Sequence, residues 1–290
     1  FMNRTEPGGP LRFEERGMTS GIATNIDGAG QATMGIAIGD VDGNGRPDVF
    51  TTNFSSDTNT LHLNLDGKFF DDRTAQFGLG AASRPLLGWA TSFDDLDHDG
   101  AEDVVIFNGH VYPQATKLAM DSDYQQPPLV MRRVGARFEV VADPGAGLRG
   151  AYRDRTAVFN DLDNDGDIDI VVGELNGPLR VLRNMHDQSN DWIKVRLRGP
   201  TPGTSHGIGA WVELSTRTPV PRVLAKRWIW AGGPFQSTAS TEVQFGVPAA
   251  WKDLQLEVRW PIVKGSTGFA PYAEVKYPVA PGSTVEFLHP

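Results

Sequence analysis

The 290-residue chain contains no cysteine, which excludes disulfide bonds and cysteine nucleophiles. No apolar run reaches the roughly 18 residues that a transmembrane helix needs, so we expect no membrane span. Lysine and arginine form no stripe that could follow a phosphate backbone, so nucleic acid is not an expected partner. Long segments of helical periodicity are also missing. Together with 33 glycines and 20 prolines, this indicates an all-β protein with many turns.

Three acidic segments share one design: residues 40–48, 95–103 and 161–169, called here the first, second and third acidic loops. Each carries oxygen-bearing side chains at positions 1, 3, 5 and 9 and glycine at position 6. Oxygens at this spacing wrap around a hard cation such as Ca²⁺, and the glycine permits a sharp turn with a positive φ. A single segment of this kind is often a solvated turn. Three copies in the same register predict calcium binding.

The predicted calcium sites use the side chains at positions 1, 3, 5 and 9 and the backbone carbonyl at position 7. The residues are Asp40, Asp42, Asn44, Arg46 and Asp48; Asp95, Asp97, Asp99, Ala101 and Asp103; and Asp161, Asp163, Asp165, Asp167 and Asp169. Asn44 gives the first loop one carboxylate fewer, so we expect it to bind more weakly. The net charge is −9, and three bound Ca²⁺ ions would reduce it to about −3. We predict about three Ca²⁺ per chain.

The flanking residues distinguish these loops from EF-hands. An EF-hand closes with a bidentate Glu at position 12 and lies between helices. Position 12 is here occupied by Thr51, Ile106 and Val172, which are not suitable closing ligands. Position 9 instead opens a run rich in β-branched residues, and strand-like residues precede each loop. Each loop is therefore predicted to join two β-strands.

Around each loop, about four short strands recur with a period of about 50 residues, which is typical of a β-propeller blade. We assign residues 31–186 to three calcium-loop blades and residues 1–30 to the second half of a preceding blade that lacks its loop. A closed propeller usually has about 4–8 blades. We therefore expect this chain to be part of a larger propeller, completed by blades from the same precursor or from another chain.

Composition changes near residue 186, and residues 187–290 are predicted to form a small β-sandwich or barrel. Six of the seven tryptophans lie between Trp192 and Trp260. Alternating segments at 192–198 and 254–260 indicate half-exposed antiparallel strands. Trp228 and Trp230 share one face of a strand. They either pack in the sandwich core or form a platform for sugar rings, and the core is the more frequent place for large aromatic residues.

These segments resemble known families. The loops with their flanking strands resemble FG-GAP/VCBS repeats, the calcium-loop blades of integrin α-chain propellers. The C-terminal part resembles the ASPIC/UnbV domain found in cartilage acidic protein and its bacterial relatives. The segments that carry the second resemblance are 108–114, 191–199, 207–214, 231–237, 243–246 and 256–261. Residues 261–270 depart from the family, which has a short Ser-Gly turn there. The resemblance implies an extracellular, calcium-dependent interaction module without an established reaction.

The predicted function is an extracellular calcium-binding propeller module for protein–protein interaction, adhesion or assembly, with structural calcium. The alternative is a secreted protein that binds or cleaves carbohydrate through its Trp-rich domain. We do not expect the protein to be an enzyme. His110 follows a strand without a recognisable catalytic partner, and Glu174 with Asp169 is only a hypothetical carboxylate pair. We expect the protein to be secreted or exposed at the cell surface, or to lie in a periplasm. The sequence contains no leader peptide, so a leader would have been removed on export.

Overall fold

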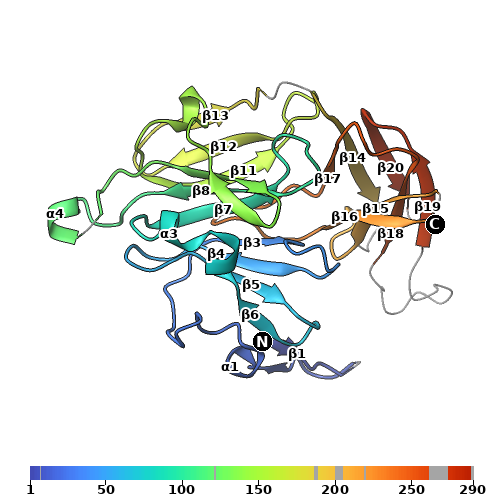
Figure 1. The fold of residues 1–290 in the computed structure, drawn as a ribbon. Coiled ribbons are helices and arrows are strands. Elements are labelled where there is room, and N and C mark those ends of the chain that lie inside the picture. Colours follow the sequence, from blue (N-terminus) through green and yellow to red (C-terminus); the bar gives the residue numbers. More distant parts are fainter. Residues whose placement is uncertain are drawn as a thin grey trace.

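The computed structural model describes residues 1–6, 8–120, 122–185, 189–199, 205–218, 220–260 and 274–288. It is nearly all β, as predicted, and its strands form several antiparallel sheets (Figure 1). No helix in the described part of the chain is long and apolar enough to cross a membrane. The predicted boundary at residues 186 and 187 and the segment 261–270 lie outside the described residues.

Three consecutive antiparallel sheets contain the acidic loops. The first has the strands β3 (Ile36–Gly39), β4 (Asp48–Thr51), β5 (Thr60–Asn64) and β6 (Phe70–Asp72), followed by the helices α2 (Thr74–Phe77) and α3 (Gly80–Ser83). The second has β7 (Gly88–Asp94), β8 (Asp103–Asn108), β9 (Leu129–Val134) and β10 (Arg137–Val140), with α4 (Lys117–Met120) between β8 and β9 and the 3-10 helix η1 (Ala146–Leu148) after β10. The third has β11 (Asp154–Asn160), β12 (Asp169–Glu174) and β13 (Leu179–Leu182). In each of these three sheets the strands are ordered as in the chain, and the acidic loop joins the first strand to the second.

Strand β8 of the second sheet is buried on both faces, and its sequence explains why. All six residues of β8 are buried, and alternate side chains of a strand point to opposite faces. Val104 and Ile106 pack with the first sheet, whereas Val105 and Phe107 pack with the third. This is why the strand is a continuous apolar run instead of an alternating one. The first strand of the second sheet, β7, contacts the first strands of both other sheets, β3 and β11 (Figure 1).

The N-terminal residues pack against the outer strands of the first sheet. They contain a two-stranded antiparallel sheet, β1 (Met2–Asn3) and β2 (Phe13–Glu14), followed by α1 (Gly17–Ser20). The backbone N–H of Ile26 donates to Asp72 Oδ2 at 2.8 Å, and the His62 Nε2 atom lies 3.1 Å from the carbonyl oxygen of Thr24. The order of these elements, two strands and then a short helix, is the same as in β5, β6 and α2 at the end of the first sheet.

The C-terminal residues form a β-sandwich with its own core. One sheet has the order β17–β14–β20 and the other β16–β15–β18–β19. The bounds are β14 (Asp191–Arg198), β15 (Trp211–Thr216), β16 (Arg222–Trp228), β17 (Val243–Val247), β18 (Leu254–Arg259), β19 (Glu274–Val279) and β20 (Ser283–Leu288). Ile193, Val195 and Phe245 from the first sheet meet Val212 and Leu256 from the second.

Two expectations for the sandwich strands need correction. β14 pairs antiparallel with β17 but parallel with β20. The outward face of β14 is also less exposed than expected: Lys194 in its middle is only 2% exposed, whereas Arg198 at its end is exposed. The reason is that this face lies against the acidic loops. Similarly, only Gln255 and Arg259 of β18 are partly exposed.

Candidate metal centres and the interface that covers them

The three acidic loops share one backbone conformation. Glycine at position 6 has a positive φ in each loop, as predicted: 79° at Gly45, 89° at Gly100 and 98° at Gly166. Position 4 has a positive φ as well, and sequence reasoning missed it: 73° at Gly43, 55° at His98 and 62° at Asn164. Glycine, asparagine and histidine tolerate this left-handed region better than most residues, so the signal was present in the sequence.

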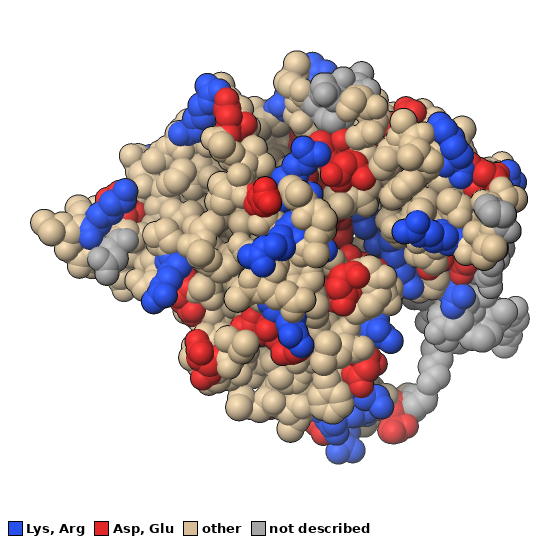
Figure 2. Space-filling view, in the orientation of Figure 1, with Lys and Arg blue, Asp and Glu red and all other residues tan. Residues whose placement is uncertain are grey.

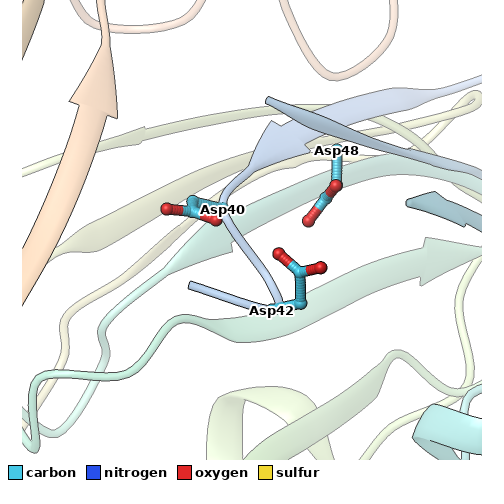
Figure 3. A group of neighbouring side chains, drawn as sticks. All are labelled: Asp40, Asp42 and Asp48. Atoms are coloured by element: carbon cyan, nitrogen blue, oxygen red, sulfur yellow. The ribbon is translucent and has the colours of Figure 1, made fainter. Parts of the chain in front are cut away.

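Three carboxylates converge in each loop. In the first loop, oxygens of Asp40, Asp42 and Asp48 lie within 4.8 Å of one another, and Figure 3 shows Asp42 and Asp48 pointing toward each other. The corresponding groups are Asp95, Asp97 and Asp99 in the second loop, and Asp161, Asp163 and Asp169 in the third. Asp103 and Asp165, predicted as ligands, stand outside these groups of three.

The first aspartate of each loop has a buried oxygen suited to a cation. Its Oδ2 atom accepts the N–H of the glycine at position 6, at 2.9 Å in the first and second loops and 3.0 Å in the third. The Oδ1 atoms of Asp40, Asp95 and Asp161 are buried and have no hydrogen-bond partner among the described residues. A buried carboxylate oxygen without a partner costs free energy, and a bound cation would remove that cost. The donor set therefore fits a hard divalent ion.

Burial also affects how readily these carboxylates ionise. It raises the pKa of Asp48 to about 7, against the opposing effect of two backbone N–H donors, and it raises the pKa of Asp40 and Asp95. Neighbouring carboxylates of the same loop raise these pKa values further. The first and second loops thus hold negative charge in places where it is unfavourable unless a cation neutralises it.

The aspartate at position 9 has a structural role that the sequence did not predict. Its two oxygens accept backbone N–H groups from position 2 of its own loop and from a residue at or just beyond the third strand of the same sheet. The donors are Val41 and Asn64 for Asp48 (both 2.8 Å), Leu96 and Arg133 for Asp103 (3.4 and 2.8 Å), and Leu162 and Asn184 for Asp169 (3.1 and 2.9 Å). This residue therefore ties the loop to a distant strand end.

Position 5 stabilises the turn locally. The side-chain oxygens of Asn44, Asp99 and Asp165 accept the N–H of position 7 at 2.8, 2.9 and 3.0 Å. Position 7 itself is held in the turn, which is compatible with the predicted carbonyl ligation by Arg46, Ala101 and Asp167. On the outer side of the second loop, Arg132 contacts Asp97 and Asp99, and on that of the third loop Arg183 contacts Asp163 and Asp165.

The C-terminal sandwich covers the second and third loops. The N–H of Gly246 donates to Asp95 Oδ2 at 3.1 Å, and the buried ammonium of Lys194 contacts Asp161 Oδ2. A Cβ atom on Gly100 would lie 2.5 Å from the Trp251 ring, and one on Gly166 would lie still closer to the Trp192 ring. The position-6 glycines of these loops are therefore required twice, for the turn and for the contact with tryptophan.

One buried ion pair connects the sandwich to two loops at once. Arg227 Nε lies 3.1 Å from Glu102 Oε1, and the two side chains are 13% and 6% exposed. Glu102, at position 8 of the second loop, also accepts the N–H of Asp40 at 3.2 Å. Gln244 completes the contact through its Nε2 atom, which lies 3.1 Å from His98 Nε2 and also donates to the carbonyl of Gly166.

The residues considered for catalysis are held by structural contacts. The Nδ1 atom of buried His110 accepts the N–H of Tyr112 at 3.1 Å, and its ring contacts Phe54 and Tyr112. Burial lowers the pKa of His110. Glu174 pairs with Arg153 at 2.7 Å, and Asp169 accepts the two backbone N–H groups described above.

Two of the tryptophans lie outside the sandwich core. The rings of Trp228 and Trp230 are stacked at a centroid distance of 6.5 Å and an interplanar angle of 27°, and Trp230 is 36% exposed. Trp260 is buried in the core, and the partly buried Trp251 packs against it.

Comparison with known proteins places the chain among related sequences. Residues 200–269, inside the predicted C-terminal domain, match the family model described as ASPIC and UnbV. The chain is 27% identical over 257 residues to cartilage acidic protein 1 of Xenopus tropicalis, covering 82% of this chain and 35% of that protein. It is 26% identical over 204 residues to cartilage acidic protein 1 of Mus musculus, covering 67% and 29%. The chain thus spans about a third of the length of these relatives. The predicted resemblance is confirmed: the chain is similar to cartilage acidic protein 1, and part of its C-terminal region is similar to the ASPIC and UnbV domain.

Proposed function

We propose that this chain is an extracellular calcium-binding module for protein–protein interaction or assembly, in which calcium is structural. The observation that carries the proposal is the repeated buried Oδ1 atom of the first aspartate, which lies beside two further carboxylates in each loop. Calcium binds six to eight oxygens, and such loops suit the millimolar concentration outside cells. Similarity to proteins named for cartilage, an extracellular matrix, supports this location.

In this proposal, calcium makes the acidic loops rigid enough to support the sandwich. Each ion would neutralise carboxylates that otherwise repel one another. The loops carry Asp95, Asp161 and Glu102, which contact the sandwich directly. Metal binding is therefore expected to favour the docked arrangement of the blades and the sandwich, because an ion that binds only the ordered loops stabilises them by mass action.

The third sheet offers a surface for an interaction partner. Among the described residues it has three strands, and β13 is its edge strand. Leu179 and Val181 on β13 are 67% and 64% exposed. Both side chains lie on the face turned away from the second sheet, because Val181 pairs with Val171 while Val172 packs in the core shared with that sheet. An exposed apolar face of this kind marks an interaction site, and propeller blades stack face to face. We propose that further blades, from the same precursor or another chain, continue the propeller there.

The distribution of charged side chains on the surface is compatible with a protein partner. On the face shown in Figure 2, Lys and Arg side chains lie interspersed with Asp and Glu side chains. Such a face does not provide the continuous positive strip that phosphate backbones require.

Thermal unfolding tests this proposal. With calcium at a hundred times the dissociation constant, each site should add about 2.7 kcal/mol to the unfolding free energy, so the Tm should fall on chelation and recover with calcium. Asp42→Asn in the first loop should lose part of this calcium response. Asp143→Asn, an exposed acid paired with Arg149 outside the loops, is the matched control and should respond as the wild type does. An identical Tm in calcium and chelator would refute structural calcium.

A further inference from the structure

A cleft of about 350 Å³ lies where the three sheets meet the sandwich. Its floor comes from the first strands β3, β7 and β11, and its roof comes from β14, β16, β17 and residues 230–240. Small-molecule sites span about 300–1,000 Å³, so the cleft is large enough for a small ligand. Its walls combine aromatic rings, Trp228 and Trp230, with the polar side chains of Asp94, Arg227 and Gln244.

Three buried polar atoms lining the cleft have no hydrogen-bond partner among the described residues. They are Asp94 Oδ2, Gln244 Oε1 and Arg227 Nη2. The first two accept hydrogen bonds and the third donates one. Leaving buried polar atoms unpaired is unfavourable, so the cleft is expected to hold groups that both donate and accept. Hydroxyl groups do both.

The aromatic wall adds an apolar surface next to these polar atoms. Trp228 and Trp230 stack at 6.5 Å between ring centroids, and Trp230 is 36% exposed. A tryptophan outside a core presents a large flat face with little loss of conformational freedom. Such a face suits the C–H surface of a ring that carries hydroxyl groups at its edge.

The charges in the cleft argue against an anionic ligand. Arg227 pairs with Glu102 at 3.1 Å, Lys194 pairs with Asp161, and Glu242 pairs with Arg196. Asp95 belongs to the second acidic loop. Both positive side chains that line the cleft are therefore already paired with carboxylates, which leaves no free cation for an anionic ligand.

We propose that this cleft binds a neutral polyhydroxylated ligand, a saccharide of one or two rings. Asp94 and Gln244 accept hydrogen bonds from its hydroxyl groups, Arg227 donates one to a hydroxyl or ring oxygen, and Trp230 stacks against the ring. Binding requires only that the sandwich be docked as in the structure. It involves no turnover, and it goes beyond the calcium-supported interaction described above.

The test uses saturation-transfer difference NMR on the whole chain in calcium. The probes are glucose, galactose, mannose, N-acetylglucosamine, lactose and maltose, with glucuronic acid as the charged comparison. At least one neutral sugar should bind saturably. Trp230→Ala and Asp94→Asn should each weaken its binding at least tenfold. Phe69→Ala removes an aromatic side chain that is 52% exposed and does not line the cleft, so it should leave binding unchanged.

Four outcomes would overturn the proposal. One is the absence of saturable binding by every neutral sugar at millimolar concentration, which would mean that the cleft holds water only. Another is binding that survives both cleft variants. A third is stronger binding of glucuronic acid than of any neutral sugar. A fourth is equal weakening by Phe69→Ala. Calcium stoichiometry is counted separately, so a failed sugar test leaves the calcium proposal standing.

Discussion

Lys194 shows how one buried residue connects the sandwich to a metal loop. It lies on β14 between the core residues Ile193 and Val195, and its ammonium contacts Asp161. A buried lysine needs a paired charge, and Asp161 supplies it. The same ammonium would stand close to a calcium ion in the third loop and repel it. The third site is therefore expected to bind calcium more weakly than its full set of carboxylates suggests.

Replacing Lys194 should separate its neutralisation of Asp161 from its repulsion of a calcium ion in the third loop. In chelator, Lys194→Met should lower the unfolding free energy by about 3–5 kcal/mol, because Asp161 is left buried without its cation. In saturating calcium the loss should be clearly smaller, since the ion can neutralise Asp161. Denaturant unfolding under both conditions measures this. The control is Arg198→Met on the same strand, whose pair with Glu286 is half-exposed, and its cost should stay within about 1 kcal/mol. Equal losses for Lys194→Met in calcium and chelator would contradict this account.

The position-6 glycines allow a second comparison between single residues. All three have a positive φ, which costs a side chain about 1–2 kcal/mol. A Cβ on Gly45 meets nothing within 4 Å, whereas a Cβ on Gly166 collides with Trp192. Gly166→Ala should therefore destabilise the protein by about 1–3 kcal/mol more than Gly45→Ala, as measured by denaturant unfolding. Equal effects would mean that the Trp192 contact contributes nothing.

At the scale of elements, ion pairs connect strands that are not neighbours. Asp154 on β11 is fully buried and pairs with Arg180 on β13, across the third sheet. Burial raises the pKa of Asp154 to about 6 from 3.8, although Arg180 opposes this. The folded state therefore holds this proton more tightly than the unfolded state. The resulting stabilisation is complete below about pH 3.8 and is lost as the pH rises through about 6.

A pH series can detect this contribution. Between pH 5 and 7, the unfolding free energy of the wild type should fall more steeply than that of Asp154→Asn, by an amount on the order of 1 kcal/mol. Arg180 stays charged throughout this pH range. In Asp154→Asn, the loss of its charged partner therefore lowers the unfolding free energy by the same amount at every pH and does not change the slope. Asp143→Asn should keep the wild-type slope, because Arg149 lowers the pKa of the exposed Asp143. If Asp154→Asn keeps the wild-type slope, Asp154 is not the titrating group.

Elements also show which features can be predicted from sequence. The acidic loops and their flanking strands follow from residues within about a dozen positions, such as the glycine at position 6. The second hydrogen bond of Asp48, to Asn64, joins residues 16 positions apart and has no local pattern. The parallel pairing of β14 with β20 joins segments still farther apart in the sequence, so alternation alone could not predict it.

At the scale of the whole molecule, the contact between sandwich and loops was the hardest feature to predict. Gly246 and Asp95 are 151 positions apart, and their hydrogen bond depends on the packing of two separately formed units. Amino-acid composition distinguished the Trp-rich domain from the acidic loops, but it did not indicate which surface of the sandwich packs against them. The buried Lys194, expected on a half-exposed strand, is explained only by that docking.

Counting bound ions tests the central claim most directly. Native mass spectrometry of the chain in calcium, repeated after exhaustive chelation, should show about three Ca²⁺ per chain that chelation removes. Asp42→Asn should reduce the count by one at limiting calcium, whereas Asp143→Asn should not change it. A chain that carries no calcium at millimolar concentration, or that carries it with the same count in Asp42→Asn, would contradict the account of calcium-supported loops beneath the sandwich.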